Sequence, residues 1–192
     1  MRIVELGWAI GDIGRSDPLV KSYLIKPIGF TIANDATMLH RITNDMAASG
    51  RSLREVLEEF VTDVFQLCRE GARLVSHHLE FDAGLLMNEF DCASLGHCKE
   101  EWSWFLRQGV CTMDLDIAHW VRQMLGIGDI PKYIPMRLLD MVNGFGLSTL
   151  PMRKAHHRAR NDAIMHWFLC RELVKRTHQF QDMSRLIEVP LC

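Results

Sequence analysis

One segment of the sequence passes from a strand pattern to a helix pattern and carries a carboxylate where the two meet. Residues 72–76 have the composition of a buried strand, and residues 83–90 begin a helical pattern. Between them lies the polar sequence His77-His78-Leu79-Glu80-Phe81-Asp82. A strand–loop–helix unit with a functional side chain at its turn is the usual architecture of a site on an α/β sheet. This segment therefore predicts an α/β fold with a site near Asp82.

A second segment places a histidine just before a helix and a carboxylate on the first turns of that helix. His157 and Asp162 lie five residues apart, and an apolar helical pattern continues from Ile164 to Leu173. A carboxylate can bind a divalent metal ion, and a neutral imidazole can take a proton from a water molecule held by that ion. Considered alone, the segment is equally compatible with a basic loop followed by a core helix.

Together the two segments resemble the signature segments of the DEDDh 3′–5′ exonuclease superfamily, the proofreading branch of the ribonuclease-H-like fold. That family has His-Asn-x-x-Phe-Asp between a strand and a helix, and later His-x-Ala-x-x-Asp-Ala. This chain has His77 to Asp82 at the first and His157-Arg158-Ala159-Arg160-Asn161-Asp162-Ala163 at the second. The resemblance implies one three-layer domain over residues 1–192, with a mixed central β-sheet flanked by helices.

The resemblance also implies the roles of individual residues. Such exonucleases hold two Mg²⁺ or Mn²⁺ ions about 4 Å apart, which clamp the attacking water and the leaving oxygen. Four acidic residues form the cage, of which Asp82 would be the third and Asp162 the fourth. His157 would be the general base. His77 would organise its loop beside the nucleic acid, although a hydrogen-bonded core histidine is the alternative.

The first two acidic residues of the family have no counterpart. They come from an Asp-x-Glu pair on the first strand, and this sequence contains no Asp-x-Glu. The run Arg2-Ile3-Val4-Glu5-Leu6-Gly7 resembles the second strand of the family, so the first strand is expected to be missing. A carboxylate inside a strand can be a ligand, but Glu5 is expected to be an edge or solvent-facing residue. A missing strand would leave a sheet position open, where a strand from a partner could add.

These observations lead to competing hypotheses about function. The first is a metal-dependent 3′–5′ exonuclease acting on DNA or RNA ends, with impaired activity because two carboxylates hold at most one ion. The start methionine would then be internal to a longer product. The second is a non-catalytic, nuclease-like module that binds nucleic acid or a protein partner. The third is a structural subunit that accepts a partner strand.

Basic and aromatic residues offer contacts for nucleic acid. The formal net charge of −2 gives no overall attraction to phosphate, so a local basic patch would be needed. Four basic residues surround His157, and we predict phosphate contacts for them, with a solvated basic loop as the alternative: Arg153, Lys154, Arg158 and Arg160. Trp102, Trp104 and Trp120 could stack on bases or belong to the core.

Composition excludes several other classes of protein. No apolar run approaches the roughly 20 residues of a membrane span, and no signal peptide pattern opens the chain. The six cysteines have no disulfide rhythm, which favours an intracellular protein. Cys92, His97 and Cys98 lack the paired spacing of most zinc sites. The Asp114 and Asp116 side chains suit the start of a helix better than a metal site.

Overall fold

The computed structural model describes residues 2–12, 14, 17–128, 134–147, 157–176 and 185–188, the last of these by their backbone. The strands are β1 (Glu5–Asp12), β2 (Leu19–Leu24), β3 (Arg73–Ser76), β4 (Val110–Cys111) and β5 (Arg185–Glu188). The helices are α1 (Asn34–His40), α2 (Asn44–Ala48), α3 (Leu53–Arg69), α4 (Leu79–Cys92), the 3-10 helix η1 (Gly96–Cys98), α5 (Lys99–Leu106), α6 (Leu115–Met124), α7 (Leu138–Gly144) and α9 (Ala159–Arg176).

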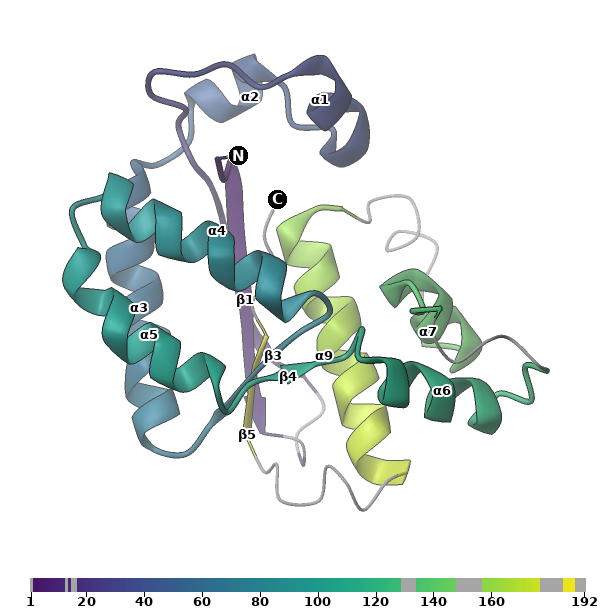
Figure 1. The fold of residues 1–192 in the computed structure, drawn as a ribbon. Helices are drawn as coiled ribbons and strands as arrows, with labels where there is room; N and C mark the ends of the chain where they lie inside the picture. The colour runs from purple at the N-terminus through teal and green to yellow at the C-terminus, as the bar shows by residue number, and fades with distance from the viewer. Residues whose placement is uncertain are drawn as a thin grey trace.

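The strands form one mixed sheet in the order β2-β1-β5-β3-β4. β1 is antiparallel to both β2 and β5, whereas β3 is parallel to both β5 and β4. Helices α3, α4 and α5 cover one face of the sheet, and α6, α7 and α9 cover the other (Figure 1). Separate apolar clusters fill the two interfaces. This arrangement confirms the predicted three-layer α/β fold.

Helix α3 forms where its sequence predicts a helix. The Ser52 side chain accepts from the backbone N–H of Glu55, and the Glu55 carboxylate accepts from the backbone N–H of Ser52, so both donors at this end are satisfied. The apolar residues of α3 at helical spacing face the sheet. Trp102 on α5 is 1% exposed and stacks on Phe65, which makes it a core residue, whereas Trp104 is 48% exposed.

The position of β5 corrects the expectation of an open place in the sheet. The β5 backbone pairs with residues 9–12 of β1 on one side and with residues 73–75 of β3 on the other. Without a strand between them, β1 and β3 would each face an unpaired row of backbone N–H and C=O groups. A C-terminal segment of the same chain supplies those partners, so the structure gives no support to a partner strand at this position.

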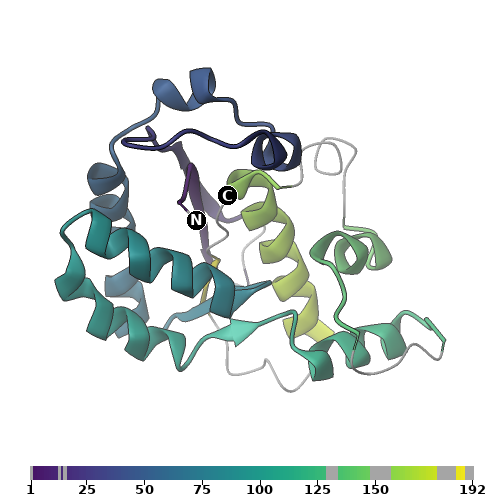
Figure 2. The same cartoon turned by 45° about the horizontal axis from the view of Figure 1, so that its top comes forward.

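The segment containing α1 and α2 passes over the end of the sheet at which β1 begins (Figures 1 and 2). The Asn44 side chain closes this segment by accepting from the backbone N–H of Ile32 and donating to the Ile32 carbonyl. Ile42 is fully buried in a small cluster with Val4 and Ile32. Within the described part of the chain, no helix has the length and apolar character needed to cross a bilayer.

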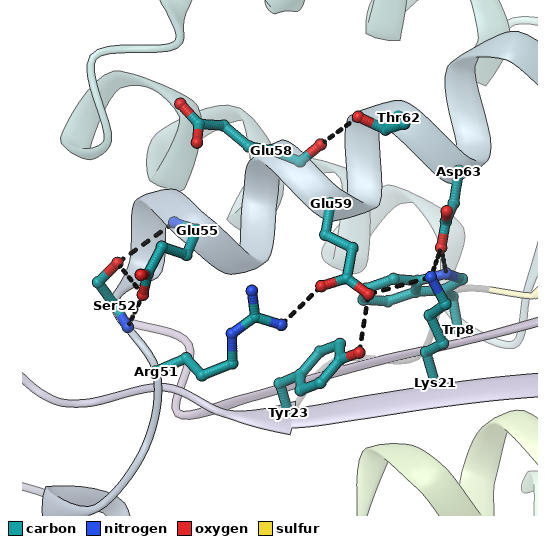
Figure 3. Close-up of polar contacts among 10 residues, drawn as sticks. All are labelled: Trp8, Lys21, Tyr23, Arg51, Ser52, Glu55, Glu58, Glu59, Thr62 and Asp63. Atoms are coloured by element: carbon teal, nitrogen blue, oxygen red, sulfur yellow. Dashed lines mark hydrogen bonds and ion pairs between the residues drawn. The ribbon is translucent and has the colours of Figure 1, made fainter.

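Polar side chains join α3 to β2 and its neighbour β1 (Figure 3). The Glu59 carboxylate accepts from Arg51 Nη1 at 2.6 Å, Tyr23 Oη at 2.7 Å and Lys21 Nζ at 3.0 Å. These contacts, that with Arg51 first, lower the pKa of Glu59 to about 2. The lowered pKa means that the charged carboxylate is the form that holds α3 to β2.

We expect Glu59→Gln to reduce the free energy of unfolding by about 1–2 kcal/mol at pH 7, because it removes charge-assisted hydrogen bonds from a partly exposed group. A folded-state pKa below the unfolded one gives stability that is present above about pH 4.5 and lost as the pH falls toward 2. The difference between wild type and variant should therefore shrink over that range in denaturant titrations. Glu58→Gln is the control, because Glu58 is half exposed and its ion pair is with Arg54 on the same helix. Equal effects of the two variants would contradict this account.

Candidate active site

Two helices from opposite faces of the sheet begin close to one edge of it. β3 ends at Ser76, and the chain turns through His77 and His78 into the first turn of α4. The first turn of α9 lies across from this turn (Figure 1). Since the carboxyl ends of parallel strands and the starts of the following helices define such edges, this is where an α/β fold places a site.

A cavity of about 390 Å³ lies between these two helix starts. It brings together four of the residues that the sequence singles out: His77, Asp82, His157 and Asp162. Met113 and the segment 135–139 close its other walls. Arg160 is exposed and does not line this cavity. Arg153 and Lys154 lie outside the described residues, so their predicted contacts with phosphate have no structural counterpart to compare.

The Asp82 carboxylate is buried at the first turn of α4, where the Ser76 hydroxyl donates a hydrogen bond to Asp82 Oδ2. Burial raises the pKa of Asp82 to about 7, and the nearby charge of Asp162 adds to the rise, while the Ser76 hydroxyl opposes it. The carboxylate is therefore held in surroundings that disfavour its free anion.

Asp162 is the second acidic residue of the cavity, and the backbone of His157 holds it. The His157 N–H donates to both carboxylate oxygens, at 3.2 Å to Oδ1 and 3.1 Å to Oδ2. His157 has φ 66°, a left-handed conformation uncommon for residues other than glycine. Burial raises the pKa of Asp162 to about 7, the His157 N–H opposes the rise, and the charge of Glu5 adds to it. The left-handed conformation of His157 costs about 1 kcal/mol, and it directs the His157 N–H toward the Asp162 carboxylate.

His77 belongs to a buried polar network behind the cavity. Its Nδ1 lies 3.1 Å from Thr112 Oγ1, which in turn lies 2.6 Å from His166 Nε2. Burial lowers the pKa of His77 to about 4 and also lowers the pKa of His166. Both imidazoles are therefore neutral at pH 7, so one hydroxyl can donate to one ring and accept from the other. The carbonyl of Met136, on the cavity wall, also hydrogen-bonds His77.

Thr112 and His166 were not predicted as site residues. His166 follows Asp162 by four residues on α9, so the two lie on the same helix face, and this spacing is the signal that could have found it. Thr112 follows the two-residue strand β4, and its backbone N–H donates to the Ser76 carbonyl at 2.9 Å. Nothing in the local sequence distinguishes it from a threonine that simply ends a strand.

The prediction that Glu5 is an edge or solvent-facing residue is wrong. Glu5 is 3% exposed, and its carboxylate accepts from Arg158 Nε and Nη2, both at 3.0 Å. The Ala159 N–H donates to the same carboxylate at 2.8 Å. The partners are more than 150 residues away in the sequence, so the strand pattern around Glu5 could not indicate them.

The donor set of the cavity fits one divalent cation. Asp82 and Asp162 both face the cavity, and burial disfavours both anions, so a cation between them would offset their charge. Mg²⁺ is commonly held by one or two carboxylates, with water and substrate phosphate in its remaining positions. Among the residues that the structure describes, no group of three or more His, Cys, Asp or Glu side chains could hold a metal. The described residues therefore do not complete a cage for two ions.

One comparison with known proteins identifies a family. A family model described as Exonuclease, of the RNase_T type, matches residues 1–167. No curated protein and no solved structure matches the chain. The matched region includes both sequence segments that face the cavity.

We expect Asp162→Asn to increase the free energy of unfolding of the metal-free protein at pH 8 by about 1–3 kcal/mol, with little change at pH 4. A folded-state pKa raised to about 7 gives stability that is complete below the unfolded pKa near 3.8 and lost as the pH rises through 7. The amide does not ionise, so the variant escapes this loss. Denaturant titrations in EDTA at several pH values measure the effect, with the exposed Asp45→Asn as control. A variant with the same pH dependence as wild type would contradict the assignment.

Thr112→Val removes the hydroxyl that joins His77 to His166 but keeps the branched shape of the side chain. We expect a loss of about 2–4 kcal/mol in the free energy of unfolding, because the half-buried His77 ring and the buried His166 ring both lose their hydrogen bond to this hydroxyl. Thr62→Val, at an exposed site where the hydroxyl bonds only the carbonyl of its own helix, should cost less than about 0.5 kcal/mol. Losses of equal size in the two variants, measured by denaturant titration, would argue against a structural role for the network.

Proposed function

Because the chain belongs to the exonuclease family whose model matches residues 1–167, we propose that it is a metal-dependent 3′–5′ exonuclease acting on the ends of DNA or RNA. The family match supports nuclease chemistry on nucleic acid in general, and the direction of cleavage is our proposal. The observation that carries it is the meeting of Asp82, Asp162 and His157 at one cavity from two separate helices. We also propose that the exonuclease domain extends over residues 1–192.

Exonucleases of this family generally use divalent metal ions, and in this chain Asp82 and Asp162 would hold Mg²⁺ or Mn²⁺. When bound, such an ion supplies Lewis acidity toward a phosphoryl oxygen and lowers the pKa of a bound water. Two carboxylates that burial disfavours as free anions favour the binding of a cation. The family resemblance implies two ions held by four acidic residues, and the chain has no Asp-x-Glu pair for the second. We therefore propose hydrolysis that is slower than a complete cage would give.

His157 is the proposed general base. It lies two residues before α9, it is exposed, and it lines the cavity that holds both carboxylates. An imidazole at this position can accept the proton of an attacking water at neutral pH. Its backbone N–H already orients Asp162, so one residue would contribute to both the acidic site and the proton transfer.

A second cavity supports a nucleotide as the substrate. It has a volume of about 590 Å³ and shares His157 and Asp162 with the first, so the two cavities meet at these residues. Much of its lining is apolar or aromatic: Phe30, Ile32, Leu39, Phe81 and Leu85. Apolar and aromatic walls suit the flat face of a nucleobase, since stacking tolerates any base. We place the terminal base here and the scissile phosphate near Asp162.

The other predicted nucleic-acid contacts remain proposals. His77 lines the first cavity, where it could contact the substrate. Arg160 is exposed on the first turn of α9, where its charge would attract a phosphate. Arg158 is half-buried and engaged by Glu5. The described cysteines are free thiols, which supports the proposal of an intracellular protein.

A non-catalytic module that binds nucleic acid or a protein partner is the second candidate. The observation that favours it is that the described residues place only two carboxylates at the cavity, and two carboxylates cannot fix a two-ion geometry. Such a module would bind nucleic acid with a strong dependence on salt and would release no product.

The test is hydrolysis of single-stranded DNA and RNA oligonucleotides labelled at the 5′ end, with Mg²⁺ or Mn²⁺ and with EDTA. We expect shortening from the 3′ end only with metal, and a loss of about a hundredfold or more in rate for Asp82→Asn, His157→Ala and Asp162→Asn. Asp45→Asn should cleave like wild type. If the folded protein binds nucleic acid in a salt-dependent way but forms no product with any metal, the exonuclease hypothesis is wrong and the binding module is favoured.

A further inference from the structure

The Glu5 carboxylate lies against the start of α9 and accepts four hydrogen bonds. Arg158 donates through Nε to Oε2 and through Nη2 to Oε1, both at 3.0 Å, and the Ala159 N–H donates to Oε2 at 2.8 Å. The Ser22 hydroxyl, on β2, donates to Oε1 at 3.2 Å. A carboxylate offers about four lone-pair positions, so these donors occupy the acceptor capacity of Glu5. Glu5 is therefore saturated by the protein itself and is not open to a ligand.

The start of α9 also packs against β1 at Gly7. A Cβ added at Gly7 would lie 2.9 Å from the carbonyl carbon of Ala159, a separation that real Cβ atoms do not show. The backbone of α9 therefore packs directly on β1 at Gly7, and Ala159 is fully buried there. The start of α9 is held both by a buried ion pair and by close backbone packing, two residues apart on one strand.

The residues positioned by this contact are those of the cavity. Asp162 is three residues after Ala159, and its backbone N–H donates to the Arg158 carbonyl at 3.0 Å. His157 directly precedes Arg158, and its N–H donates to the Asp162 carboxylate. A shift of the helix start along β1 would move both side chains relative to Asp82, which is carried by another helix. Misplacement of about 1 Å at such a site can cost about a hundredfold in rate.

From this geometry we propose that Glu5 and Arg158 are positioning residues of the active site, whose ion pair holds the first turn of α9 in the place that Asp162 and His157 require. The predicted effect on kcat rests on the proposed exonuclease function, whereas the predicted effect on amide exchange does not. It also gives Arg158 a role different from the phosphate contact predicted from the sequence. Two of its donor groups point to Glu5 in the parallel geometry that makes an arginine–carboxylate pair strong.

Glu5→Gln is the primary test, because it keeps the size of the side chain and removes its charge. We expect the rate constant kcat for oligonucleotide hydrolysis to fall about tenfold or more while KM changes less than about twofold. We also expect the affinity for Mn²⁺, measured by electron paramagnetic resonance without substrate, to fall about tenfold, as for loss of an outer-shell partner. Backbone amide hydrogen exchange of residues 159–163 should become about tenfold faster.

Glu59→Gln is the matched control, since it makes the same chemical change in another carboxylate with several donors (Figure 3). Glu59 lines neither cavity of the site, so kcat, Mn²⁺ affinity and the exchange of residues 159–163 should stay within about twofold of wild type. The double variant Glu5→Gln with Arg158→Gln should be no worse in kcat than Glu5→Gln alone, because the two residues act as one unit.

The outcomes separate this proposal from the proposed function. A Glu5→Gln protein whose amide exchange matches that of Glu59→Gln would overturn the positioning role, even if the wild-type protein has no nuclease activity. A change in KM without a change in kcat would also overturn it, because Arg158 would then act on the substrate. If wild type is inactive but exchange of residues 159–163 accelerates in Glu5→Gln alone, the positioning role stands and the exonuclease function fails.

Discussion

The candidate site depends on two carboxylates at one end of the sheet, of which Asp82 is buried and Asp162 is partly buried. Burying a carboxylate without a counter-charge is costly, and the protein offers each one only limited compensation. The Ser76 hydroxyl serves Asp82, and the backbone N–H of His157 serves Asp162. Because this compensation is limited, the pKa values of both carboxyl groups are raised. A bound cation would offset that cost, so the raised pKa values and the proposed affinity for metal would have the same cause.

The contrast with other buried acidic groups makes this interpretation specific. Glu89 is fully buried, yet it accepts from Arg2 Nε and from the backbone N–H of Ile3. Glu5 is buried as well, and four donors surround it. Those two carboxylates are satisfied within the protein and hold the structure together. Asp82 is buried and Asp162 is partly buried, and their described contacts supply one hydroxyl and one backbone N–H, respectively, as expected where a site trades stability for function.

Helix α9 links the scaffold to the site. Its first turn carries Asp162, and its buried side chains, including Trp167 and Leu173, pack on the sheet and on α7. The contact between the start of α9 and β1 therefore fixes the position of Asp162 relative to the sheet. Behind the cavity, Thr112 joins a histidine of the β3–α4 turn to a histidine of α9. The α9–β1 contact and the Thr112 hydrogen bonds each connect segments that are far apart in the sequence, and both lie beside the same cavity.

The parts of this structure that the sequence could predict are local. A capping box and an apolar stripe specify α3, and the short spacing from His157 to Asp162 and from His77 to Asp82 indicates where each cavity residue lies on its own helix start. The Glu5–Arg158 pair and the Thr112 network could not be predicted, because each depends on contacts between distant segments. The placement of β5 between β1 and β3 also escaped prediction. β5 pairs with backbone N–H and C=O groups of both β1 and β3, and no local sequence pattern indicates that these groups need a partner.

Calorimetric titration of the wild-type protein with Mn²⁺, at pH 7.5 and without nucleic acid, measures whether Asp82 and Asp162 together hold a metal ion. We expect one ion per chain, with binding abolished by either Asp82→Asn or Asp162→Asn. The same titration should release protons, because the ion displaces them from carboxylates with pKa values of about 7. Two ions per chain would contradict the incomplete cage, and binding that survives both substitutions would contradict the site itself.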